Sequence, residues 1–149
     1  MPDAAQKIVP HHAGHRDRLR ERFLKTGAEG FQDYELLEMV LFAAIPRRDV
    51  KPLAKKLLQE FGGLAGVLCA SPADLQKVKG LSENSATLLK VVQALSVRML
   101  KNDIEKKPIL GSWQKLIDYC TVAMAHEKRE HFRILYLNRK NQLMADEVQ

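Results

Sequence analysis

Apolar residues recur every three or four positions along most of the chain, and this spacing predicts a mainly α-helical protein. Glycines and prolines interrupt the pattern and indicate where successive helices end. The first 14 residues show little periodicity and contain two prolines, so we expect a flexible tail there. Helices are expected over residues 15–26, 33–45, 50–61, 64–69, 72–79, 82–100 and 112–125.

The period changes near the carboxyl end of the sequence. Residues 132–137 and 142–148 flank the polar turn 138–141, which predicts a β-hairpin. The first of these strands is apolar on both faces apart from Arg133, as is typical of a strand in a sheet covered on two sides. We therefore expect the hairpin to begin an incomplete second domain. The alternative is that it folds back on the helices or pairs with another copy.

Charge, Pro108 and Gly111 indicate a linker after the long sixth helix. The expected organisation is a helical domain over residues 15–102, a linker over 103–111, and the start of a second domain over 112–149. The fold class is thus mainly α, with a helix and a β-hairpin from an incomplete α/β domain at the end.

Composition excludes several classes of protein. Of 149 residues, 46% are hydrophobic and 28% are charged, which is enough apolar material for a core without disulfide or metal support. Cys69 and Cys120 have no C-x-x-C spacing and are expected to be reduced thiols. Residues 1–10 lack the apolar core of a signal peptide, and no apolar run could span a bilayer. We expect a cytoplasmic protein without membrane contact.

The charge balance favours a polyanionic partner. Lysine and arginine total 24 against 18 acidic residues, a net charge of +6. A positive excess of this size favours nucleic acid as a partner over the function of an enzyme for acidic substrates.

Residues 75–89 resemble a helix-hairpin-helix motif, whose core is hydrophobic-Gly-hydrophobic-Gly followed by a small residue. Gly80 matches the first glycine, Leu81 the hydrophobic position and Ala86 the small one, whereas Ser82 replaces the second glycine. Gly80 permits a left-handed turn, and the following helix start presents free backbone N–H groups to a phosphate. The alternative is that the motif only packs two helices together.

Backbone-directed phosphate binding would be insensitive to base sequence and weakened by salt. Nearby lysines would add attraction, and small polar side chains would donate hydrogen bonds. The candidate nucleic-acid-binding residues are Lys77, Lys79, Gly80, Leu81, Ser82, Asn84, Ser85 and Lys90, with Arg47 and Arg48. These two arginines form a basic cluster with Lys51, Lys55 and Lys56; a solvated face is its default interpretation, and a second phosphate contact is the alternative.

Other chemistry is weakly represented. His11, His12 and His15 include an i, i+4 pair that would suit a metal if the segment were helical, but no cysteine or carboxylate completes a site. A solvated tail is the preferred interpretation. The sequence contains no phosphate loop, no G-x-G-x-x-G and no H-E-x-x-H.

Several blocks together resemble the RadC family of bacterial proteins over essentially the whole chain. They are GHRDRLRERF (14–23), DYELLEMVLF (33–42), PRRDVKPLAKKLL (46–58), FGGLAGVL (61–68) and FRILYLNRKNQLMADEV (132–148). The resemblance implies a helix-hairpin-helix domain like domain 2 of RuvA, at about residues 71–100, followed by a JAB/MPN-type domain. The family name also carries an association with DNA repair.

In that family the JAB/MPN domain carries a JAMM-type zinc site built from a His-x-His pair and a downstream Asp. This sequence contains no His-x-His, so no catalytic residue, no metal ligand and no cofactor are predicted in it, and zinc is expected only with a downstream JAMM motif. We expect a non-catalytic DNA-binding module. One alternative is that the chain is part of a zinc metallopeptidase whose helical region binds substrate or a protein partner. Another is an interaction module that self-associates through the hairpin.

Overall fold

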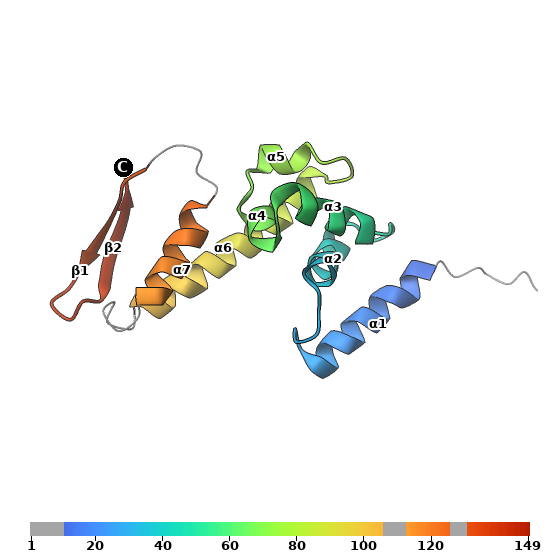
Figure 1. Cartoon of the computed structure of the whole chain (residues 1–149), viewed down its shortest axis with the longest axis horizontal. Coiled ribbons are helices and arrows are strands. Elements are labelled where there is room, and N and C mark those ends of the chain that lie inside the picture. Colours follow the sequence, from blue (N-terminus) through green and yellow to red (C-terminus); the bar gives the residue numbers. More distant parts are fainter. Residues whose placement is uncertain (1–10, 106–112, 126–130) are drawn as a thin grey trace, which may run out of the picture.

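The computed structural model describes residues 11–105, 113–125 and 131–149. In this part of the chain, seven helices are followed by a two-stranded antiparallel sheet, so the predicted mainly α fold with a terminal hairpin is confirmed (Figure 1). The elements are α1 (His11–Thr26), α2 (Asp33–Ala44), α3 (Lys51–Phe61), α4 (Leu64–Cys69), α5 (Pro72–Gln76), α6 (Glu83–Glu105), α7 (Trp113–Met124), β1 (Arg133–Leu137) and β2 (Leu143–Val148).

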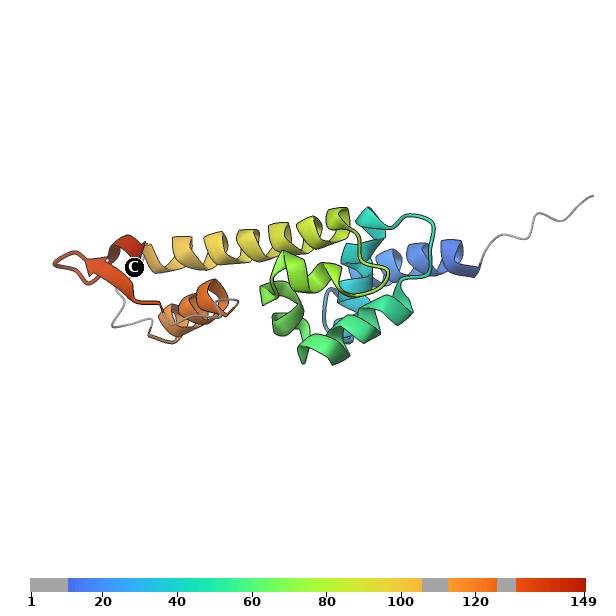
Figure 2. The same ribbon diagram turned by 90° about the horizontal axis from the view of Figure 1, so that it is seen from above.

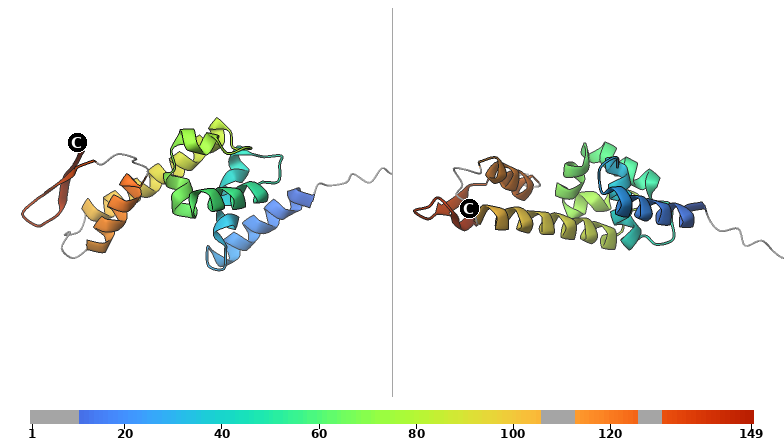
Figure 3. Two further views of the ribbon diagram at one scale, coloured as in Figure 1. Left: turned by 45° about the horizontal axis from the view of Figure 1, so that its top comes forward. Right: turned by 90° about the horizontal axis from the view of Figure 1, so that it is seen from below.

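The long helix α6 organises the molecule. Helices α2, α4 and α5 pack against its amino-terminal half, and α1 and α3 pack against α2. Helix α7 lies beside the carboxyl-terminal half of α6, next to the hairpin (Figures 2 and 3). The larger core is built where α2, α3, α4 and α5 meet α6. Its fully buried members are Leu37, Leu41, Val50, Ala54, Leu57, Val67, Leu75, Val78, Ala86 and Leu89.

A second, smaller core joins α6, α7 and the hairpin. Leu116, Tyr119 and Leu143 are buried in it, and Val97 and Leu100 of α6 pack against them. The hairpin therefore folds back on the helices, which is the alternative raised by its sequence. Its other face is open, with Phe132 81% exposed and Tyr136 45% exposed.

Local signals explain the short helices. The Ser71 hydroxyl accepts the backbone N–H of Asp74 at 3.1 Å, so Ser71 caps α5 as predicted, and Pro72 occupies the first turn. In the hairpin turn, the Asn138 side chain accepts the backbone N–H groups of Lys140 and Gln142, and Asn141 adopts a positive φ of 57°.

Two predicted boundaries are wrong. Helix α1 begins at His11, four residues before the expected start, because nothing between Pro10 and the periodic segment prevents a helix; residues 1–10 lie outside the described part. Helix α6 runs on to Glu105, past the expected helix end at residue 100. Its charged end lies on a continuous helix, where Asp103 pairs with Lys115 of α7 at 2.8 Å. The rest of the predicted linker, residues 106–111, lies outside the described residues.

The two cysteines are free thiols, Cys69 buried and Cys120 half-buried. Within the described ranges, no helix is both long enough and apolar enough to cross a membrane.

Candidate nucleic-acid interface

The connection between α5 and α6 is a short turn at Gly80. Gly80 adopts a φ of +102°, in the region that favours glycine, and the Leu81 N–H donates to the Val78 carbonyl at 3.0 Å. The apolar residues of the motif face the core, because Leu75, Val78, Leu81, Ala86 and Leu89 are all buried. The two helices therefore form a packed α-hairpin around a glycine turn.

The amino terminus of α6 is partly satisfied by its own side chains. The Ser82 hydroxyl accepts the Ser85 N–H at 3.3 Å and lies 3.1 Å from the Ser85 hydroxyl, and Ser85 is fully buried. Ser82 is thus the cap of α6, and Ser85 is not accessible to a ligand. Asn84 is exposed, but it lines a separate groove beside Ala43 and Ala44 of α2. The first-turn backbone N–H groups remain the direct donors at this helix end.

The structure places Lys90 away from the predicted interface. Its ammonium group donates to the carbonyls of Leu68 and Ala70, at 2.9 and 3.0 Å, at the carboxyl end of α4. Burial lowers the pKa of the Lys90 side chain, and the negative end of α4 compensates for its charge. Lys90 is therefore a structural residue that ties α6 to α4, and we withdraw it from the candidate site.

The Lys77 side chain also has a protein partner. Its ammonium group lies 2.8 Å from the Asp74 carboxylate, and this hydrogen bond raises the pKa of Lys77. Lys79, on the turn itself, is exposed, and the described part of the chain offers it no hydrogen-bond or ion-pair partner.

The two predicted contacts, at the Gly80 turn and at Arg47–Arg48, form one surface. The Arg48 guanidinium donates to the Gly80 carbonyl at 2.6 Å, which joins the α2–α3 loop to the turn. A groove of about 310 Å³ lies at this junction. We call it the turn groove; it is lined by Arg48, Asp49, Pro52, Leu53, Lys56, Lys79 and Gly80. Arg47 is exposed on the same loop.

Within the basic cluster of the sequence, Lys56 is the lysine that the structure places in the turn groove. It belongs to a basic run that includes Lys51 and Lys55, and the sequence alone does not separate the three. In the structure, the ammonium groups of Lys51 and Lys55 lie over the Tyr34 ring, 5.5 and 4.7 Å from its centre, whereas Lys56 lines the turn groove. Helical spacing puts Lys51 and Lys55 on one face of α3 and Lys56 on another. Only the position of the glycine turn shows which of the two faces lines the groove.

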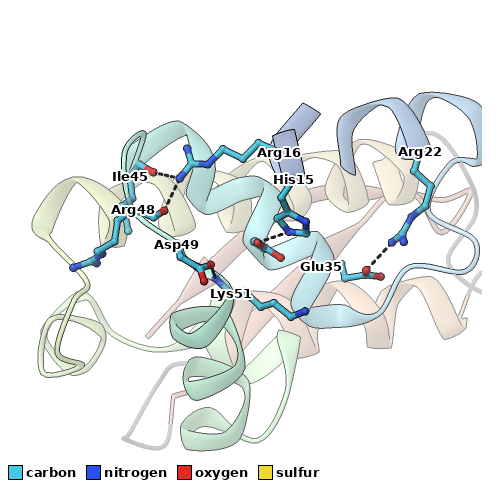
Figure 4. Close-up of polar contacts among 9 residues, drawn as sticks. His15, Arg16, Arg22, Glu35, Ile45, Arg48, Asp49 and Lys51 are labelled. Carbon is cyan, nitrogen blue, oxygen red and sulfur yellow. Dashed lines mark hydrogen bonds and ion pairs between the residues drawn. The ribbon is translucent and has the colours of Figure 1, made fainter. Parts of the chain in front are cut away.

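Helix α1 fixes the backbone of this loop. The buried Arg16 side chain donates to the carbonyls of Ile45 and Arg48, at 2.7 and 2.6 Å (Figure 4), and more weakly to that of Phe42. The Arg16 guanidinium also stacks over the Phe42 ring, 4.5 Å from its centre. One arginine thus terminates α2 and holds Arg48, whose own side chain reaches Gly80.

Electrostatics of the turn groove favour an anion. Three cationic side chains, Arg48, Lys56 and Lys79, line it with one carboxylate, Asp49. That carboxylate accepts the backbone N–H of Lys51 at 3.0 Å and so serves the start of α3. The groove contains no histidine or cysteine and has no arrangement for nucleophilic or acid–base catalysis.

These features define a helical domain with a cationic groove at a glycine turn, followed by a further helix and hairpin. Residues 11–87 match the family described as UPF0758 N-terminal, and residues 110–149 match the one described as RadC-like JAB domain. The first match covers more than half of the chain, so the chain belongs to the UPF0758 family, in agreement with its RadC-like motifs.

A UPF0758 protein of Rhodobacter capsulatus is 53% identical to this chain over 131 residues. The alignment covers 88% of this chain and 61% of the relative, so the chain spans less than two thirds of the relative's length. No solved structure matches the chain.

The zinc site implied by the JAB resemblance does not fit the residues present. The sequence contains no His-x-His pair. In the hairpin, the Asp146 carboxylate is bonded to Arg133 and Tyr119, and the Glu147 carboxylate accepts the Tyr136 hydroxyl. The Asp146 Oδ2 atom and the Glu147 carboxylate thus have protein partners, and no catalytic step is derived from them.

Proposed function

We propose that this chain binds the phosphate backbone of DNA, without base specificity, through the turn groove and the adjacent start of α6. The observation that carries the proposal is the convergence of Arg48, Lys56 and Lys79 on the Gly80 turn. Cations held in a groove beside backbone N–H donors attract phosphate and position it without contacting bases.

The energetic signature of such binding is a strong dependence on salt. Each phosphate contact releases condensed counterions, so the slope of log K against log salt changes by about 0.9 per contact on duplex DNA. Two or three contacts give modest affinity and near-equal binding to unrelated sequences, as expected for a module that accompanies another domain.

The test is fluorescence anisotropy of labelled duplex and single-stranded DNA at about 50 mM salt and above. The double variant Lys56→Ala/Lys79→Ala is expected to bind about tenfold more weakly, with a salt slope smaller by between about one and two. The loss arises because both charges leave the groove while the fold keeps its core.

The matched control is Lys51→Ala/Lys55→Ala, which removes the same charge from the face of α3 where the lysines lie over Tyr34. It is expected to weaken binding no more than about twofold, because these two lysines do not line the turn groove and salt screens exposed charges that make no direct phosphate contact. Equal losses in both double variants, or no binding by the original chain at low salt, would overturn the proposal.

A second candidate function is self-association through the hairpin, favoured by its open apolar face. Phe132 and Tyr136 lie on this face, and within the described residues the sheet has only two strands, each with an unpaired edge. Light scattering is expected to show dimers that dissociate on dilution and are lost in Phe132→Ser. A monomer at all concentrations would contradict this candidate.

A further inference from the structure

Another cleft lies where α6, α7 and β1 meet beside the smaller core (Figure 2). Its volume is about 280 Å³, and its two charged side chains are Arg98 of α6 and Arg133 of β1. Among the described residues, no carboxylate lines it. The other walls include Ala94, Val97, Tyr119 and Ala123. We call this site the hairpin cleft; it shares no residue with the turn groove.

The guanidinium group of Arg133 has a free edge. Its Nη1 atom donates to the Asp146 carboxylate at 2.7 Å and to the Tyr119 hydroxyl at 3.0 Å. The Nε atom is buried without a partner among the described residues, where the Nη2 atom also has none. Buried N–H groups rarely lack an acceptor, and one edge of a guanidinium suits a planar oxyanion through two parallel hydrogen bonds. The Nε–Nη2 edge of Arg133 is therefore available to an oxyanion.

The net charge at the hairpin cleft matches one negative charge on a ligand. Arg98 and Arg133 carry two positive charges, and the Asp146 carboxylate beside Arg133 neutralises one of them. Arg98 is exposed, and the described part of the chain offers it no ion-pair partner. Tyr119 adds no charge at neutral pH, because burial and its hydrogen bond to Asp146 raise its pKa to about 12. A carboxylate carries one negative charge, whereas a phosphate monoester carries about 1.5 to 2, so the cleft favours a carboxylate.

The shape of the cleft indicates what is attached to this carboxylate. Ala94, Val97 and Ala123 form an apolar wall, which favours an apolar group next to the charge. The volume is near the lower limit of about 300 Å³ for small-molecule pockets, so the enclosed part of the ligand is short. Ala94 and Arg98 are exposed, so the cleft is open on this side of α6 and a longer chain can extend into solvent.

We propose that the hairpin cleft binds the carboxyl terminus of a peptide whose last side chain is apolar. The terminal carboxylate lies between Arg98 and Arg133 and accepts hydrogen bonds from the free edge of Arg133. The last side chain packs against the wall formed by Ala94, Val97 and Ala123. Because Arg98 belongs to α6 and Arg133 to β1, a bound carboxylate joins the long helix to the hairpin. Binding therefore stabilises the fold and raises Tm.

The experiment is an NMR titration of the ¹⁵N-labelled chain with acetyl-Gly-Gly-Leu that has a free carboxylate, at about 50 mM salt and pH 7. We expect chemical-shift changes at the residues of the hairpin cleft, with a Kd of about 1 mM or tighter. The same peptide with a carboxamide end is expected to bind at least tenfold more weakly, because it lacks the charge that the arginines recognise. Acetate is expected to be weaker by a similar factor, because it lacks the apolar side chain.

Two variants test the charge and the shape of the cleft separately. Arg98→Gln removes one positive charge and is expected to weaken binding of the peptide at least fivefold. Ala94→Leu fills the cleft without a change of charge and is expected to abolish binding. Both positions are exposed, so the rest of the amide spectrum is expected to stay unchanged. Arg133 is left intact because it pairs with the nearly buried Asp146.

Arg18→Gln is the matched control, because it removes one exposed arginine from α1, at the other end of the molecule (Figure 1). It is expected to keep full affinity for the peptide. The proposal is overturned if about 10 mM peptide causes no shift at the cleft. It is also overturned if the carboxamide peptide, acetate or inorganic phosphate binds as tightly as the peptide, if Arg98→Gln keeps full affinity, or if Arg18→Gln loses affinity equally.

Discussion

Replacing Arg16 with methionine is expected to lower the free energy of unfolding by about 3 kcal/mol. Arg16 is 8% exposed, and its guanidinium donates hydrogen bonds to the carbonyls of Ile45 and Arg48. Hydrogen bonds from a charged group contribute more than neutral ones, and the Ile45 carbonyl after α2 would lose its donor. Methionine keeps apolar contact with Phe42 and so isolates the polar loss. Urea unfolding followed by circular dichroism measures the change.

Arg18→Met is the matched control, because Arg18 is exposed on the same helix. It is expected to change the free energy of unfolding by less than about 0.5 kcal/mol. A stability of Arg16→Met within about 1 kcal/mol of the original chain would show that water replaces the guanidinium easily.

Replacing Asp146 with asparagine is expected to have a comparable effect at the other end of the molecule, a loss of about 3 kcal/mol. The Asp146 side chain is 4% exposed and lies 2.7 Å from the Arg133 guanidinium, and it also accepts the Tyr119 hydroxyl. Removing its charge leaves a largely buried arginine without a counter-ion, a costly state in a low-dielectric environment. Glu147→Gln, in an exposed neighbour, is expected to change stability by less than about 0.5 kcal/mol. Equal stability of the two variants would contradict this account.

The cluster of Tyr119, Arg133 and Asp146 also makes the stability of the chain depend on pH in the alkaline range. Burial, with the hydrogen bond to Asp146, raises the pKa of Tyr119 to about 12. Because this folded-state pKa lies above the unfolded value, the contribution to stability is complete below about pH 10 and is lost as the pH rises through 12. Absorbance at an ultraviolet wavelength sensitive to tyrosinate should show a step near pH 12 that is absent in Tyr119→Phe.

Several predictions from the sequence were close because short-range signals determine them. The glycines and prolines end the helices, Ser71 caps α5, and the polar turn after residue 137 closes a hairpin. Gly80 occupies a left-handed turn because few other residues adopt that φ. Errors arose where no local signal opposes helix formation, at the start of α1 and at the end of α6.

The direction of each charged side chain was not predictable in the same way. Lys90 and Lys79 are both lysines near one motif, yet Lys90 turns inward to two carbonyls of the α4 end while Lys79 lines the turn groove. Glu38 is a carboxylate on the buried face of α2, beside Leu37 and Leu41. A charge on a buried face needs a partner, but the sequence does not say which one.

By itself, the sequence determined which segments are helical, where the hairpin lies, and that a glycine turn precedes the longest helix. These properties follow from backbone preferences and apolar spacing, which act over a few residues. Only the tertiary structure decided that Arg48 meets Gly80, that Arg16 supports this loop, and that His15 meets Glu38. These partners are between 23 and 32 residues apart in the chain, and they meet because packing of the apolar helix faces brings them together.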